Sequence, residues 1–273
     1  MRTILISIFS FLMALGLSSC SKGDMYSTGD GGAQYEIAAS FDGGAASRTT
    51  IDRDNNPHWV VGDMVWISTG DPLTATCGTV ASVEEKTGIA RIVTSLDLSG
   101  KTVYAVYPYS GDDACSVDPD GRIMFGIPPE QSGKFEEANI CAAVGDVSAG
   151  LRFKNVTSVF KIEGRTSDVG KMLFEKTGVC GSYAFDCTTM EVVPVDAADA
   201  VTAKPESGTY GPYYVAVAPG LTYQKDEAIA RYCKLNGACL RTKTTKNGLG
   251  PLERSRIYNL GTTYVTIDAD ITL

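Results

Sequence analysis

Residues 59–68 read WVVGDMVWIS, and this stretch sets the expectation for the fold. Gly62-Asp63 is a turn signal, and the apolar run Met64–Ser68 after it has the length and residue types of a β-strand. The segment Lys101–Tyr109 (KTVYAVYPY) has the same character, since it is rich in β-branched and aromatic residues that favour strands. These stretches predict short strands joined by tight turns.

Strand candidates of this kind continue outward in both directions, from Tyr35–Phe41 to Thr263–Asp268. About thirteen or more short strands with Gly, Pro, Asn and Asp between them are typical of β-sandwiches and barrels. In the second half we expect three short strands, at Lys171–Lys176, Gly181–Phe185 and Met190–Val195. One turn of helix is expected within Phe135–Val144. The chain is therefore predicted to be all-β, and its length suits two stacked β-sandwiches better than one.

The N-terminus has the features of an export signal. A basic start at Arg2 precedes the 14-residue run Ile4–Leu17, which is too short to span a bilayer and has the length of a signal-peptide core. The run ends in Leu17-Ser18-Ser19-Cys20, which resembles a lipobox, the motif of bacterial lipoproteins in which the cysteine is acylated. We therefore expect lipidation at Cys20. The predicted division is a signal peptide at 1–19, a flexible tether at 20–33, an N-terminal β-sandwich at 34–165 and a C-terminal β-sandwich at 166–273.

Composition and charge exclude several classes of function. The 273 residues carry 24 Lys and Arg against 32 Asp and Glu, a net charge of −8, which argues against nucleic acid as a partner. The single histidine, His58, excludes a multi-histidine metal site. No motif of a hydrolase, a nucleotide-binding protein or a zinc protease is present. The acidic residues between 112 and 120 do not follow the order of an EF-hand and are expected to form a solvated loop. We expect neither an enzyme nor a bound cofactor or metal.

The eight cysteines leave seven after lipidation of Cys20, so at least one is unpaired within a monomer. Two pairs close in sequence, Cys180/Cys187 and Cys233/Cys239, could each form a disulfide across a short hairpin. The alternative is that several are buried free thiols, which we favour for Cys141. No C-x-x-C motif supports a redox or zinc site.

Several motifs occur in the order found in one known family. They are Arg48-Thr49, the stretch Trp59–Ile67, Tyr104–Ser110 (YAVYPYS), Leu151–Val156 (LRFKNV) followed by Phe160-Lys161-Ile162, and Arg256–Gly261 (RIYNLG). Together with the lipobox, they resemble the fimbrillin family of type V pili from Bacteroidales. The resemblance covers nearly the whole mature chain.

The resemblance implies two transthyretin-like β-sandwiches and a structural role at the cell surface. In such pili a protease cuts the outer-membrane lipoprotein after a basic residue and removes the first strand. A strand of a neighbouring subunit then satisfies the opened sheet edges. Here Tyr35–Phe41 would be the removed strand, Arg48 or Arg53 the cleavage site, and Arg256–Leu273 the donor. Shaft, anchor and tip roles stay open, as does the choice between a lipid-anchored outer-membrane protein and a processed extracellular fimbria.

A second reading is a surface lipoprotein that binds glycans on a similar scaffold. Its candidate ligand-facing aromatic residues are Trp59 and Tyr107, although core packing is the simpler expectation for both. The partners expected are other fimbrial subunits, the outer membrane through the lipid, and surface glycans or proteins of host or bacterial cells. Fold alone does not separate the two readings.

Overall fold

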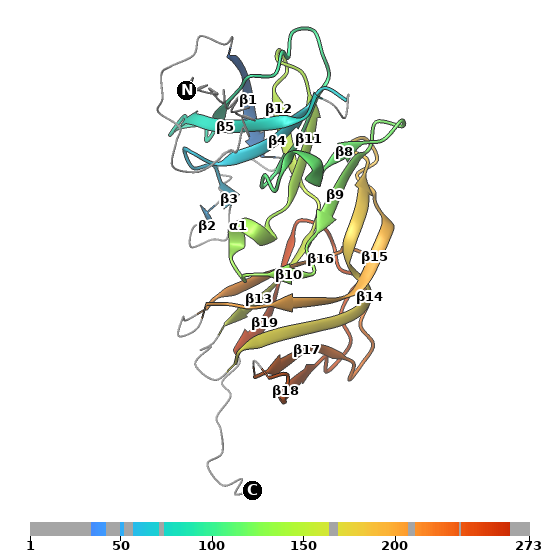
Figure 1. Ribbon diagram of the computed structural model, residues 1–273. Coiled ribbons are helices and arrows are strands. Elements are labelled where there is room, and N and C mark those ends of the chain that lie inside the picture. Colours follow the sequence, from blue (N-terminus) through green and yellow to red (C-terminus); the bar gives the residue numbers. More distant parts are fainter. Residues whose placement is uncertain are drawn as a thin grey trace, which may run out of the picture. The chain divides into compact units, whose positions relative to one another are not determined.

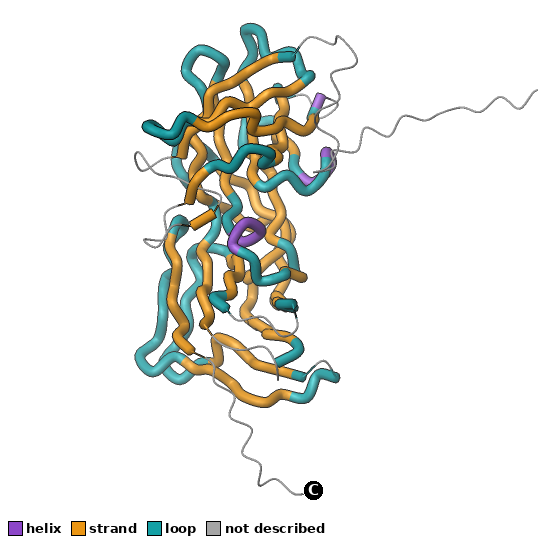
Figure 2. The backbone as a smooth tube through the Cα atoms, turned by 90° about the vertical axis from the view of Figure 1, so that its left-hand side faces the viewer, coloured by secondary structure: helices purple, strands orange, loops and turns teal. Residues whose placement is uncertain are grey.

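The structure is a computed structural model, and it describes residues 34–41, 50–51, 57–70, 74–163, 169–206, 211–234 and 236–262. The prediction of an all-β chain is confirmed. Strands dominate this part of the chain (Figure 2), with one short α-helix, α1 (Phe135–Ala138), and a 3₁₀ turn at Asp112–Ala114. No helix here is long and apolar enough to cross a membrane. Cys20, Arg48, Arg53, the signal and tether segments and residues 263–273 lie outside the described residues.

Seven strands between Tyr35 and Asn155 close into a barrel (Figure 1). In barrel order they are β1 (Tyr35–Phe41), β12 (Leu151–Asn155), β11 (Cys141–Gly145), β7 (Val103–Tyr107), β4 (Met64–Ser68), β5 (Thr76–Val83) and β6 (Ala90–Thr94). Their alternate residues point inward and form one cluster with Ile37, Ile92 and Phe153 among its members. The alternation of apolar and polar residues in the sequence is thus the alternation between barrel interior and solvent.

The strand β4 departs from that alternation because both of its faces are buried. Val65 and Ile67 belong to the barrel interior, whereas Trp66 belongs to a second and larger cluster outside the barrel. The indole Nε1 of Trp66 donates a hydrogen bond of 2.8 Å to the backbone oxygen of Asp112. This double burial explains why residues 64–67 are apolar without interruption.

A second sheet is built around the long strand β14 (Lys171–Phe185). Its neighbours are β15 (Val192–Ala203), β17 (Ala228–Cys233) and β9 (Ile123–Ile127), with β10 (Glu130–Gln131), β18 (Cys239–Thr244) and β8 (Ser116–Val117) attached to those. β14 pairs with β17 near its start and with β9 near its end. One strand therefore connects two parts of the sheet.

A third sheet places β13 (Ser158–Glu163) between β16 (Tyr213–Val217) and β19 (Arg256–Thr262). β13 is antiparallel to β16 and parallel to β19. All five residues of β16 are buried, which matches its continuous apolar sequence YYVAV. A two-stranded pair, β2 (Thr50–Ile51) and β3 (Pro57–His58), completes the strands.

Strand pairing crosses the predicted division at residue 165. β9 and β10 precede it but pair with β14 and β15, and β13 pairs with strands that follow it. By contact density, Gly32–Leu273 forms one compact unit. The two domains at 34–165 and 166–273 stay a prediction.

Candidate functional site

The first strand, β1, closes the barrel wall. It runs antiparallel to β6 from Tyr35 to Ala39, and its last residues from Ala39 to Phe41 run parallel to β12. β1 is therefore hydrogen-bonded on both sides, next to β12 in Figure 1. Removing it would leave β6 and β12 as two edges with unpaired N–H and C=O groups, which is the geometry that accepts another strand.

The inward face of β1 is apolar and fully packed. Ile37 and Ala39 are each 1% exposed and Phe41 is 8% exposed. The rings of Phe41 and Trp59 stack at 4.5 Å between centroids. Phe153 lies 5.9 Å from Phe41. The end of β1 thus covers aromatic residues of the barrel interior.

The alternative that Trp59 and Tyr107 face a ligand is wrong, and the simpler expectation of core packing holds for both. Trp59 is 4% exposed and Tyr107 is 3% exposed, and both belong to the barrel interior. Trp59 makes edge contacts with Phe153 at 5.1 Å and with Tyr107 at 5.4 Å. Both rings are therefore core residues. An aromatic side chain that is enclosed on every side has no exposed face on which a sugar could stack.

The polar side-chain contacts of β1 lie at the surface, at Glu36 on its outward face and at Tyr35 at its start. Glu36 pairs with Arg91 at 3.3 Å, and the two side chains are 51% and 61% exposed. Tyr35 hydrogen-bonds to Asp97, whose negative charge raises the pKa of Tyr35 above its ordinary value. Exposed pairs of this kind contribute little to stability. The apolar inward face and the backbone ladder therefore hold β1 in place.

A glycine turn fits closely against β1. The β11–β12 turn is closed by a 2.8 Å hydrogen bond from the Gly150 N–H to the Asp146 oxygen. Gly150 has φ +75°, and a Cβ at this position would lie 2.9 Å from the backbone oxygen of Ala38. This contact could not be predicted from the sequence, because the turn signal DVSAG does not reveal which strand passes beside it.

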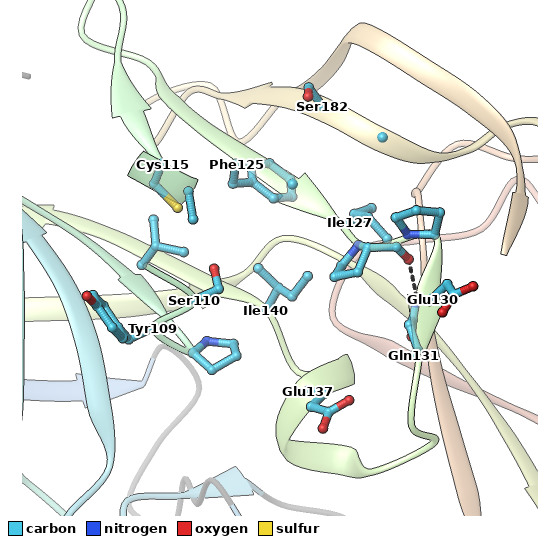
Figure 3. A pocket seen from close by; sticks show the side chains of 17 residues that line it. Tyr109, Ser110, Cys115, Phe125, Ile127, Glu130, Gln131, Glu137, Ile140 and Ser182 are labelled. Carbon is cyan, nitrogen blue, oxygen red and sulfur yellow. Dashed lines mark hydrogen bonds between the residues drawn. The ribbon is translucent and has the colours of Figure 1, made fainter. Parts of the chain in front are cut away.

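A hollow of about 480 Å³ lies between β9 and the end of β7 (Figure 3). Its lining is largely apolar, with Phe125, Ile127 and Ile140 among the residues labelled. The buried amide of Gln131 crosses one end, since its Nε2 donates to the oxygens of Pro128 (3.0 Å) and Ala216 (2.9 Å). Its Oε1 accepts the Ala216 N–H at 2.8 Å. Gln131 thus joins β10 to β16.

The polar groups around this hollow do not form a catalytic arrangement. Burial raises the pKa of the Cys115 thiol to about 12, so it stays protonated and is a poor nucleophile. Within the described residues, no group of three or more His, Cys, Asp or Glu could hold a metal ion. In the nearby acidic loop, Arg122 pairs with Asp118 at 2.7 Å and with Asp120 at 3.2 Å. Asp112 accepts a hydrogen bond from the Tyr109 hydroxyl, and Asp113 is exposed.

No disulfide joins the seven cysteines of the described residues, and the two predicted pairs differ in geometry. Cys180 and Cys187 cannot meet, because β14 continues without a turn from Cys180 through Phe185, five steps of strand that span about 17 Å, and only one residue stands between Phe185 and Cys187. That prediction is wrong. Cys233 and Cys239, in contrast, are direct partners across β17 and β18. Cys141 is buried as a free thiol, as expected.

Comparison with known proteins gives structural neighbours only. No family model and no curated protein matches the chain. It is similar to a crystal structure provisionally described as a cell adhesion protein from Bacteroides thetaiotaomicron, at 10% identity and TM-score 0.40 over 87% of this chain and 98% of that one. A protein from Bacteroides ovatus with the same provisional description has 15% identity and TM-score 0.41, over 84% and 92% of the two chains.

The tip fimbrial protein Mfa3 from Porphyromonas gingivalis matches at 8% identity and TM-score 0.31, over 75% of this chain and 80% of that one. The solved structures named here are thus two provisionally described cell adhesion proteins and one tip fimbrial protein of Bacteroidales. At these identities, and with TM-scores below 0.5, the similarity by itself assigns neither a family nor a role to this chain.

Proposed function

We propose that this chain is a structural or accessory subunit of an adhesive cell-surface fimbria. In this proposal it reaches the outer membrane as a lipoprotein acylated at Cys20 and assembles by strand complementation. The observation that carries it is the position of β1. The first strand of the folded body closes a barrel, covers the aromatic residues Trp59 and Phe153, and carries the exposed ion pair of Glu36 with Arg91 on its outer face.

The candidate donor segment is shorter than the range Arg256–Leu273 expected from the sequence. The first part of Arg256–Leu273 is β19, which pairs with β13 in the chain's own sheet. Residues 263–273 read TYVTIDADITL, with apolar residues at every odd position from 265 to 273. That alternation is what a barrel wall requires, and β1 has it at positions 37, 39 and 41.

Cleavage after Arg48 or Arg53 would separate β1 from the rest of the barrel. Both residues stand between β1 and β3, so a cut at either one leaves β4–β7 and β11–β12 in one chain. The fragment that carries β1 would then be held only by its ladder and its apolar face.

The two candidate residues of the glycan-binding reading are not available to contact a glycan. Trp59 and Tyr107 are buried, and the exposed large hydrophobic side chains of the described residues are all aliphatic. Nothing in the described residues favours it as a second proposal.

The experiment compares surface-extracted protein from cells that express four forms of the chain: wild type, Arg48→Gln with Arg53→Gln, a chain ending at Thr262, and Arg152→Gln as a control on the outer face of β12. We expect wild type and the control to begin at Thr49 or Asp54 and to form a ladder of multimers on unboiled gels. The double arginine variant should stay uncleaved and monomeric. The chain ending at Thr262 should be cleaved without forming a ladder. An uncleaved, strictly monomeric wild-type protein would contradict the proposal.

A further inference from the structure

The last residue of β17 and the first residue of β18 are both cysteines. Cys233 and Cys239 are register partners in this antiparallel pair. The turn between them is closed by two hydrogen bonds of 2.9 Å, from the Gly237 N–H to the Lys234 oxygen and from the Lys234 N–H to the Ala238 oxygen. Lys234 thus directs both its N–H and its C=O toward the β18 side of the turn. Cys233, one residue earlier in the strand, directs its own N–H and C=O the other way, so Cys233 and Cys239 face each other without a backbone hydrogen bond between them.

A contact on the other side of β17 supports this pairing independently. The Cys233 carbonyl accepts a 2.9 Å hydrogen bond from the Gly170 N–H, at the start of β14. The N–H and C=O of one strand residue point to the same side, so the backbone of Cys233 is turned toward β14 and away from β18. Non-hydrogen-bonded partners have Cα atoms about 4.5 Å apart, within the range of about 4.4–6.8 Å that a disulfide spans.

The two thiols differ in accessibility. Among the seven cysteines of the described residues, Cys239 is the exposed one, whereas Cys233 is 3% exposed. Burial, followed by the neighbouring Cys239 thiol, raises the pKa of Cys233 above its ordinary value. An oxidant from solution therefore meets Cys239 first, and Cys233 can react only from within the hairpin.

We propose that Cys233 and Cys239 form an intrachain disulfide through thiol–disulfide exchange with a disulfide-bearing oxidant. The Cys239 thiolate attacks the oxidant's disulfide, forms a mixed disulfide and releases one thiol. Cys233 then loses its proton and attacks the sulfur of Cys239, which releases the second thiol. The two protein thiols lose two electrons and two protons, and the oxidant's disulfide gains both.

The bond would fix the edge of the second sheet. Among the described residues β18 is the edge of that sheet, and β17 is the strand paired with it. Most of its residues are exposed. A cross-link at the turn ties this edge strand to β17, which is itself paired with β14. The proposal is independent of the fimbrial role, since it depends only on the hairpin.

The test uses trypsin, because Arg231, Lys234 and Arg241 place one cleavage site between the cysteines and one on each side. The folded chain is incubated with oxidised glutathione, blocked with N-ethylmaleimide and digested without reduction. We expect the peptides YCK (232–234) and LNGACLR (235–241) to appear as one cross-linked species that separates on reduction. If the two peptides appear separately with blocked cysteines, or if Cys239 retains glutathione beside a blocked Cys233, the proposal is overturned.

Single variants test the order of attack. Cys233→Ser should retain one glutathione on Cys239, and Cys239→Ser should carry neither glutathione nor a cross-link at Cys233. Cys187→Ser is the matched control and should give the same cross-linked peptide as wild type. The wild-type digest remains decisive if a variant fails to fold. A cross-link from Cys239 to any other cysteine, or to a second chain, would also overturn the assignment.

Discussion

Trp59 is the residue on which the two functional readings differ. Its ring stacks on Phe41 and meets Phe153 and Tyr107 edge-on, so it joins β1 to the opposite wall of the barrel. We expect Trp59→Ala to lower the free energy of unfolding by about 3–5 kcal/mol, because truncating a fully packed aromatic residue leaves a cavity. Urea denaturation followed by circular dichroism measures this loss. Val61→Ala, at a side chain that is 53% exposed, is the control and should cost less than about 0.5 kcal/mol. A small loss for Trp59→Ala would contradict its place in the core.

Gly150 permits a turn to lie directly against β1. Its positive φ disfavours any other residue, and an added Cβ would in addition crowd the Ala38 oxygen at 2.9 Å. Gly100→Ala separates the two effects, since Gly100 has φ +64° with nothing within 4 Å of an added Cβ. We expect Gly100→Ala to cost about 1 kcal/mol and Gly150→Ala clearly more. Denaturation midpoints of the two variants decide the matter, and equal losses would show that the contact with β1 is unimportant.

Glu227 makes stability depend on pH. Lys176 Nζ lies 2.6 Å from one carboxylate oxygen of Glu227, and the Gln224 N–H donates to the other. The hydrogen bond from Lys176, and next the one from Gln224, lower the pKa of Glu227 in the folded chain. A lowered pKa contributes stability that is present above the unfolded value of about 4.3 and is lost as the pH falls through the folded value.

Glu227→Gln should therefore be less stable than wild type near pH 7, with the difference shrinking as the pH falls below about 4. Unfolding free energies measured across this range test the expectation. Glu130→Gln is the control, because Glu130 pairs with Lys204 while 70% exposed and should change little at any pH. A difference between wild type and Glu227→Gln that stays constant with pH would contradict the assignment.

At the scale of elements, strands with at least one buried face could be predicted from their apolar pattern, whereas exposed parts of strands could not. Tyr35–Phe41 and Met64–Ser68 are strands with the expected bounds, because burial on one or both faces leaves an apolar pattern in the sequence. β14 was expected as two short strands. The strand is in fact continuous. Its bulges and the glycines Gly178 and Gly181 interrupt the alternation of apolar and polar residues, but they do not end the strand. The end of β15 was missed because residues 195–200 are exposed, so nothing selects apolar side chains there.

The turn of helix predicted within Phe135–Val144 is present, but the same range also contains the start of a strand. α1 covers Phe135–Ala138, and β11 begins at Cys141. Phe135 and Ala138 are buried on one side of a single turn. A pattern of four residues is too short to distinguish such a turn from an entry into a strand, so the boundary depended on the pairing of β11 with β7.

Removing β1 should open the barrel, and Trp59 can report it. The chain has two tryptophans, so a Trp66→Phe background leaves Trp59 as the single indole. We expect a chain that begins at Thr49 to show red-shifted Trp59 emission, because Phe41 no longer covers the ring. An added peptide with the sequence of residues 34–42 should restore the emission. The same peptide with Phe41→Asp is the control and should not. Unchanged emission on removal of β1 would show that the strand is not what covers Trp59.

At the scale of the whole molecule, local sequence patterns cannot reveal how the barrel closes. β1 meets β12 through Ala39 and Leu151, more than a hundred residues apart, and no local pattern specifies this parallel contact. The candidate site depends on that closure, so the sequence indicated the displaceable strand only through the family resemblance. No local pattern predicts the contact of Gln131 either, whose buried amide joins β10 to β16 across the predicted division at residue 165.

The pairing of strands across residue 165 makes a prediction about cooperativity. Phe174 of β14 is fully buried, and its ring stacks on that of Phe160 at 5.7 Å, in the cluster that also contains Trp66. Trp59 lies in the other cluster, inside the barrel. If the clusters unfold together, a cavity at Phe174 must destabilise the surroundings of Trp59 although the two residues belong to different clusters.

We therefore expect Phe174→Ala, in the Trp66→Phe background, to shift the urea midpoint of Trp59 emission as far as it shifts the midpoint of circular dichroism. The loss should be about 3–5 kcal/mol in both signals. Phe153→Ala, inside the barrel, is the matched variant and should also move both signals together. If Phe174→Ala leaves the Trp59 midpoint in place while circular dichroism separates into two transitions, the halves of the chain unfold independently, as two separate β-sandwiches would.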